Sequence, residues 1–436
     1  MKNEFQSVRT NIAQSATFKA IIIGALILIM LIPISLIRNL IHERDAAGAL
    51  VKAEVSSKWG ERQTLTGPVI CIPYRYKAND GNTTRELREM AYFLPEELTI
   101  ESALEPEIRY RSIYKVVVYQ SSIKATGTFN RPDFDKLNIN PTSIEWENCR
   151  LILGISDLKG ICSNIDFQWD GTLLESMSGI NESYLAKSGV TIKVPLSTND
   201  SDTQTYSFDF SFSLNGSEGL FFVPVGKTTH VKMSSSWDAP SFVGAFLPDT
   251  RDISAENGFT AAWNILSYNR NYPQMWTGGA YQITSTEFGV NLILPVDHYL
   301  KTERSVKYAI MFIALTFLIF FLVELISRKK IHPFQYLLVS IGLMIFYCLL
   351  LSLSEYMHFN LAYLFSAIAI ISLITSYSFT IFKSKTETVS MGCFLVALYL
   401  FLFTILQLEE LALLVGSIGL FVALATVMYF SRKVEW

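Results

Sequence analysis

Apolar residues are gathered in separate stretches of this chain rather than spread evenly along it. A window of about 19 residues finds one strongly apolar segment near the N-terminus and a dense group of such segments after residue 305. Since about 20 helical residues cross a hydrocarbon core of ~30 Å, the pattern predicts a 1+5 arrangement of six membrane spans. They lie at about Ala20–Ile37, Tyr308–Ile326, Pro333–Leu353, Leu361–Phe382, Met391–Leu406 and Leu411–Phe430.

Between the first span and the others, the pattern changes to the period of a β-strand. In TYSFDFSFSL (205–214), large apolar side chains alternate with Ser and Asp. Asn215-Gly216 and a second apolar run (220–225) follow, so we expect a hairpin there. The region predicts a mainly-β, sandwich-like domain with room for two sub-sheets. Other strand-like runs are VICIPY, YKVVVYQ, GVTIKVPL and FGVNLILPV.

These patterns predict the domain organisation. Apolar positions continue beyond the first span at helical spacing, which indicates a stalk helix at the start of the β-domain. Ala47-Gly48-Ala49 resembles a signal-peptidase site, but the apolar core before it is longer than a signal peptide requires, so we expect an uncleaved anchor. The predicted parts are a cytoplasmic N-terminus (1–19), span one (20–37), the β-domain with its stalk (38–304), a five-span bundle (305–430) and a tail (431–436).

Charge decides the expected orientation. The chain has 436 residues, 50% hydrophobic and 17% charged, with a mean hydropathy of +0.30 and a net charge of −3, which gives no reason to expect nucleic acid. Lys and Arg occur in the loops at 326–332 and 382–388 and in the tail, whereas the alternate loops at 354–360 and 407–411 have none. The positive-inside rule therefore predicts cytoplasmic termini and an extracytoplasmic β-domain.

Motifs for catalysis or cofactor binding are absent from the sequence. Gly226-Lys227-Thr228 lacks the earlier glycine of a phosphate-binding loop, because position 221 is Phe. HERDA (42–46) lacks the second histidine of a zincin, and no GxSxG occurs. The five cysteines show no metal spacing, and a Cys149–Cys162 bridge stays open. We expect no cofactor, no metal and no enzyme activity.

Two polar stretches at span ends supply the candidate functional residues. Glu324 lies in an apolar run, and an intramembrane acid is by default a functional candidate. It stands four residues before Arg328, however, so an interfacial ion pair is the favoured reading; His332 lies in the same loop. At the opposite edge, Glu355 and His358 accompany Ser352 and Ser354. They read as an interfacial cap or, alternatively, as the polar cluster of a membrane enzyme.

Several segments resemble the CreD family of bacterial inner membrane proteins, in order and over nearly the whole chain. The most specific are HPFQYLLV (332–339) and FYCLLLSLSE (346–355); others are LIPISLIRNLIHER (31–44), LTGPVICIP (65–73), APSFVGAFLP (239–248) and GFTAAW (258–263). Ser340 stands where the family leads us to expect glycine. The resemblance implies one N-terminal span, a large periplasmic domain, a C-terminal bundle and a role in cell-envelope integrity linked to two-component regulation and colicin tolerance. It implies no catalysis or cofactor.

We therefore expect a non-enzymatic inner-membrane protein that contacts the lipid bilayer and binds an unknown envelope component or protein through its β-domain. The sequence does not decide the oligomeric state. Two alternatives stay open: a sensor or accessory subunit of another membrane machine, and an integral membrane enzyme or transporter with its polar cluster at the outer interface. Transporters carry polar groups near the bilayer midplane, whereas charges here lie at span ends, which disfavours a carrier.

Overall fold

The computed structural model describes residues 16–80, 83–139, 143–196, 204–294, 298–327, 331–408 and 411–431. It divides into two compact units. Unit 1 comprises Met1–Gly48 and Val296–Trp436, and unit 2 comprises Ala49–Pro295. Arg328, the other bases of its loop and the C-terminal tail lie outside the described residues.

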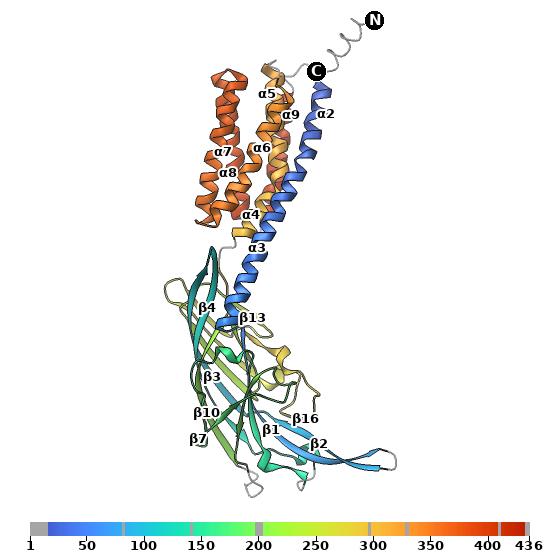
Figure 1. Cartoon of the computed structure of the whole chain (residues 1–436), viewed down its shortest axis with the longest axis vertical. Helices are drawn as coiled ribbons and strands as arrows, with labels where there is room; N and C mark the ends of the chain where they lie inside the picture. Colours follow the sequence, from blue (N-terminus) through green and yellow to red (C-terminus); the bar gives the residue numbers. More distant parts are fainter. Residues whose placement is uncertain are drawn as a thin grey trace. The chain divides into compact units, whose positions relative to one another are not determined.

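Unit 1 is helical (Figure 1). Four helices of the described residues are long and apolar enough to cross a membrane, and a fifth candidate is the pair α4–α5, bent by 44°. The coarse prediction of a membrane protein with several spans is confirmed, while the count of six stays a prediction. The helices are α2 (Ala16–Ile29), α3 (Leu31–Trp59, which continues into unit 2), α4 (His298–Lys307), α5 (Ala309–Ser327), α6 (Pro333–Ser354), α7 (Phe359–Phe382), α8 (Lys385–Gln407) and α9 (Ala412–Ser431).

Unit 2 is built from two sheets, as the strand-like runs predict. The nine-stranded sheet has the order β13-β17-β11-β1-β5-β9-β8, with β2 between β1 and β16. Parallel pairing of β1 with β11 makes it a mixed sheet. Its strands are β1 (Gln63–Asp80), β2 (Thr83–Phe93), β5 (Arg150–Ile155), β8 (Ser176–Ser178), β9 (Gly189–Lys193), β11 (Gly219–Val223), β13 (Pro240–Gly244), β16 (Met275–Thr277) and β17 (Phe288–Leu292).

The second sheet of unit 2 has eight strands. Its order is β14-β15-β12-β3-β4-β10-β6-β7, and β12 pairs with β3 in parallel. The long strands β3, β4 and β10 form its centre, side by side (Figure 1). The strands are β3 (Glu97–Arg111), β4 (Tyr114–Asn130), β6 (Asp166–Trp169), β7 (Thr172–Leu174), β10 (Thr205–Ser217), β12 (Thr228–Ser235), β14 (Thr250–Ser254) and β15 (Gly258–Leu266).

An aromatic core joins the two sheets face to face. Alternation along β10 buries Phe208, Phe210 and Phe212 and leaves the intervening polar residues on the outer face. Across the interface, the rings of Trp263 in β15 and Phe288 in β17 lie 5.5 Å apart. Because each such ring removes a large apolar area from water, this core is the main stabilising feature of the sandwich.

The predicted hairpin after β10 is wrong. Residues 215 and 216 are not a turn, because β10 stays paired with β4 as far as Ser217 opposite Val118. β11 then joins the other sheet, between β1 and β17, and the chain changes sheet at Glu218, where φ is +65°. Gly216 is required for packing instead: a Cβ there would lie 2.3 Å from the hydroxyl oxygen of Tyr119.

The C-terminal end of α3 is held by the β3–β4 hairpin. Trp59 donates its indole N–H to the carbonyl of Tyr119 at 3.3 Å, and the guanidinium of Arg109 lies 3.7 Å from the Trp59 ring centroid. One turn earlier, Glu54 pairs with Arg111 at 2.9 Å. The strands at the centre of the eight-stranded sheet therefore also fix the end of the stalk helix.

The cysteines form no bridge in the structure. All five are free, with Cys149 buried and Cys162 exposed, so the bridge that the sequence left open is not made. Burial raises the pKa of the Cys149 thiol, which keeps it protonated and unreactive.

Candidate functional site

Glu324 lies near the end of α5 and is almost fully buried, with 5% of its surface exposed. Its Oε1 accepts the backbone N–H of Ile331 at 3.0 Å, and its Oε2 accepts the hydroxyl of Tyr336 at 3.1 Å. Lys19 of α2 forms an ion pair with the same carboxylate. Three separate donors therefore satisfy this acid, and together they tie α2, α5 and the start of α6 to one another.

The base on Glu324 is one that the sequence could not indicate. Lys19 precedes Glu324 by 305 positions, so no helical spacing relates the two residues. The predicted pair with Arg328 stays a prediction, because Arg328 lies outside the described residues. The Tyr336 ring packs edge-on against Phe317, with centroids 5.4 Å apart, which holds its hydroxyl toward the acid.

His332 caps the helix that begins beside this ion pair. Its Nδ1 accepts the backbone N–H of Phe334 at 3.3 Å, and its backbone N–H donates to Oε1 of Gln335 at 2.9 Å. Pro333 occupies the first helical position, where no N–H is needed. His332 is thus engaged in starting α6.

Glu355 ends the same helix and contacts side chains from other helices. Tyr299 of α4 donates its hydroxyl to Oε1 at 3.2 Å, and Arg44 of α3 lies 3.9 Å from the same oxygen. Ser354 donates to the carbonyl of Leu351, and His358 is exposed at the N-cap of α7.

The residues of the suggested enzyme cluster are not joined by hydrogen bonds. Among the described residues, the Glu355 carboxylate accepts none from Ser352, Ser354 or His358. No group of three or more potential metal ligands occurs in the described part of the chain either.

A second kind of site lies on the outer face of the eight-stranded sheet. The pairing register places one charged row across five strands: Lys232 on β12, Glu101 on β3, Lys124 on β4, Ser211 on β10 and Asp166 on β6. Charges of opposite sign therefore alternate along the first three strands. Among the described residues, Glu101 forms no ion pair with either neighbouring lysine.

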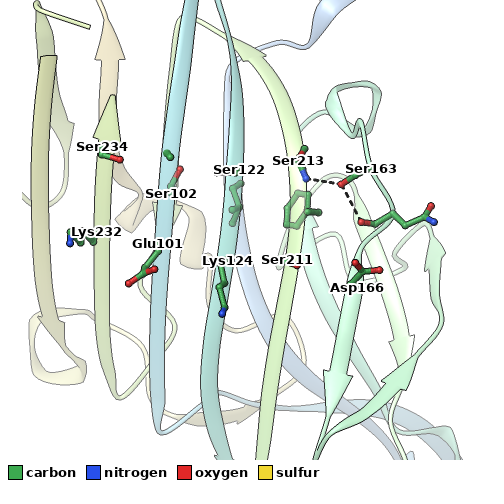
Figure 2. A pocket seen from close by; sticks show the side chains of 14 residues that line it. Glu101, Ser102, Ser122, Lys124, Ser163, Asp166, Ser211, Ser213, Lys232 and Ser234 are labelled. Carbon is green, nitrogen blue, oxygen red and sulfur yellow. Dashed lines mark hydrogen bonds between the residues drawn. The ribbon is translucent and has the colours of Figure 1, made fainter. Parts of the chain in front are cut away.

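The next row on this face is made of small side chains. Ser234, Ala103, Ser122 and Ser213 stand opposite one another on β12, β3, β4 and β10. Because these side chains are short, a hollow of about 600 Å³ opens over them beside the charged row. We call this hollow the polar trough; Figure 2 shows its serines and charged residues on neighbouring strands.

A loop closes one end of the polar trough. Ser163 accepts the backbone N–H of Ser213 at 2.8 Å and donates to the carbonyl of Asn164 at 3.2 Å (Figure 2). These bonds fix the loop against β10, so the end wall of the trough is preformed.

The polar trough cannot be predicted from the sequence alone. Alternation along β10 reveals its solvent-facing side, but a row of residues across several strands is visible only when the register of neighbouring strands is known. The parallel pairing of β12 with β3 brings Lys232 beside Glu101, and no local pattern predicts that neighbour.

The profile of the family described as Inner membrane protein CreD matches residues 15–436 of this chain. A relative, the inner membrane protein CreD of Escherichia coli (strain K12), is 31% identical over 419 residues, which cover 94% of this chain and 91% of the relative. The resemblance noted from the sequence segments is thereby confirmed, and the chain belongs to the CreD family of inner membrane proteins.

Proposed function

We propose that this chain is a non-catalytic inner membrane protein that supports cell-envelope integrity by binding an envelope component in the polar trough. The observation that carries the proposal is the trough itself: a preformed hollow of about 600 Å³ in which Glu101 and Lys232 form no ion pair with any described residue. Exposed polar groups in a hollow are available to a ligand, whereas the carboxylates of Glu324 and Glu355 in unit 1 already have donors within the protein.

The proposal includes a topology. Six spans with both termini in the cytoplasm put the β-domain in the periplasm, where envelope components are found. Cys162 provides a test, since it is an exposed thiol of unit 2. A membrane-impermeant maleimide applied to spheroplasts labels Cys162 in this topology, with Cys162→Ser as the control; protection until the cells are lysed would place the domain inside.

The function is tested by complementation of a strain that lacks the protein. Ser122→Val fills the floor of the trough, and Lys124→Ala removes a charge from its wall. Thr126→Val is the matched control, because position 126 follows on the same strand and face, opposite Thr99 and Asp209 and outside the trough. We expect both trough variants to fail to restore resistance to envelope stress at normal abundance, and the control to restore it. Full complementation by both trough variants would refute this function.

A sensor or accessory subunit is the second candidate, and one observation favours it. β3 and β4 line the trough and also hold the end of α3 through Arg109 and Arg111. This candidate predicts a stable protein partner that co-purifies in mild detergent after crosslinking in native membranes, and that is lost when both arginines are replaced.

A further inference from the structure

The polar trough has the dimensions of an extended chain. It crosses the strands from β12 to β6, and five strands about 4.8 Å apart span ~19 Å. The charged row forms one wall. On the other side, the next row of the same face carries the longer, exposed side chains of Glu105 and Gln120, which are paired across β3 and β4. A ligand lying along the serine floor would therefore be flanked on both sides.

The chemistry of the trough excludes several classes of ligand. Lysines and acids alternate along its wall, so it has no single-sign field to attract a polyanion such as a nucleic acid. It is the face of a sheet rather than an edge, its two large apolar lining residues, Ile123 and Phe212, are buried, and its lining contains no arginine, so it lacks the usual features for binding peptides. A lipid surface would need apolar side chains beside the bases.

What the trough does offer is hydroxyl groups and charges of both signs at close spacing. Serine hydroxyls donate and accept hydrogen bonds, lysine ammonium groups donate, and the carboxylates of Glu101 and Asp166 accept. A chain of sugar units presents hydroxyl and amide groups along its length and satisfies all three kinds of partner.

We propose that the polar trough binds a hydroxyl- and amide-bearing glycan chain laid across strands β12, β3, β4, β10 and β6. This inference rests on the proposed function, because it names the class of the envelope component. The small side chains at 103, 122 and 213 let the glycan approach the sheet, and Lys232, Glu101 and Lys124 bind its polar groups from the side.

The probe is a series of N-acetylglucosamine oligomers of increasing length, titrated by calorimetry into the full chain in detergent micelles. We expect saturable binding that strengthens with length until the trough is filled. Ser122→Val and Lys124→Ala should each weaken binding by about tenfold, as expected when a hydrogen-bonding position is lost. Thr126→Val, at a half-buried position, and Lys193→Ala, at an exposed one, lie outside the trough and should leave binding unchanged. Unaltered thermal midpoints show that the variants are folded.

The outcomes separate this inference from the function on which it rests. If the wild-type chain binds no oligomer, or binds a sulfated polyanion more tightly, the glycan inference is wrong. The proposed function then survives if the trough variants still fail complementation, and the bound component belongs to another chemical class. If the oligomers bind but Ser122→Val and Thr126→Val weaken binding equally, the glycan site lies elsewhere and the inference is also wrong.

Discussion

The carboxylates of Glu324 and Glu101 show how differently the two units treat a charge. Glu324 is buried among apolar helices. Its carboxylate accepts hydrogen bonds from Lys19 of α2, from Tyr336 of α6 and from the backbone N–H of Ile331, which precedes α6. Glu101 is exposed on the eight-stranded sheet, stands between two lysines in register, and pairs with neither among the described residues. An acid that water cannot reach must be neutralised by the protein itself. An exposed acid that has no ionic partner within the protein remains available to bind a ligand.

The largest effect is expected at Glu324. Replacing it by Ala leaves Lys19, the Tyr336 hydroxyl and the Ile331 N–H without their acceptor, and breaking a buried pair in this way costs about 3 kcal/mol. We expect much lower abundance in membranes and a lower thermal midpoint in detergent, both measured against the wild type.

Two further variants sharpen that result. Glu324→Gln keeps an acceptor for Tyr336 and should lose less stability than Glu324→Ala. Glu303→Ala removes a pair with the exposed Lys307 one helical turn away on α4 and should change stability by less than about 0.5 kcal/mol. Normal abundance of Glu324→Gln with lost function would instead make Glu324 a working acid rather than a structural one.

A smaller effect is expected inside the β-domain, at Gly216. The added methyl group of Gly216→Ala would meet the ring of Tyr119, whose hydroxyl donates to the carbonyl of Gly219 at 2.8 Å. Overpacking of this kind costs about 2 kcal/mol, which a lowered midpoint in thermal unfolding would report. An unchanged midpoint would show that position 216 has free space.

A pH-dependent effect on stability is expected at Glu145, a surface carboxylate that is paired with two arginines. Hydrogen bonds from Arg75, at 2.8 Å, and then from Asn148 and Arg88 lower the pKa of this carboxyl from 4.5 to about 2. A lowered folded-state pKa stabilises the protein above pH 4.5, and the contribution is lost as the pH falls from 4.5 to 2. Because both arginines are exposed, the effect should stay below about 1 kcal/mol.

Glu145→Gln provides the measurement. Thermal midpoints of the wild type and the variant should differ at pH 6 and converge toward pH 2. Curves that remain parallel over this range would show that Glu145 titrates as an unpaired acid.

The sequence predicts what is local and misses what depends on register. Hydropathy locates the apolar helices, and alternation locates strands such as β10, because both follow from neighbouring residues. The strands that pair with β11 cannot be predicted from neighbouring residues. Asn215-Gly216 has the composition of a turn, yet pairing with β4 keeps these two residues extended. For the same reason, Glu324 could be singled out from sequence, whereas its contact with Lys19 and the row from Lys232 to Asp166 could not.

The smallest effect on stability is expected in the polar trough. Lys124 is exposed and lies 3.9 Å from Asp209, a weak surface pair, so Lys124→Ala should change the free energy of unfolding by no more than about 0.5 kcal/mol. Thermal unfolding checks this. A loss of stability comparable to that of Glu324→Ala would mean that the trough serves the fold rather than a ligand.

The most direct test is site-specific photocrosslinking in living cells. A photoreactive amino acid at Ser122 probes the floor of the polar trough, and one at Lys193 probes an exposed position on the nine-stranded sheet. We predict adducts at 122 and none at 193, and their mass should fall on digestion with a glycan hydrolase. Adducts at 193 with none at 122 would contradict the claim that the trough is the binding surface of this protein.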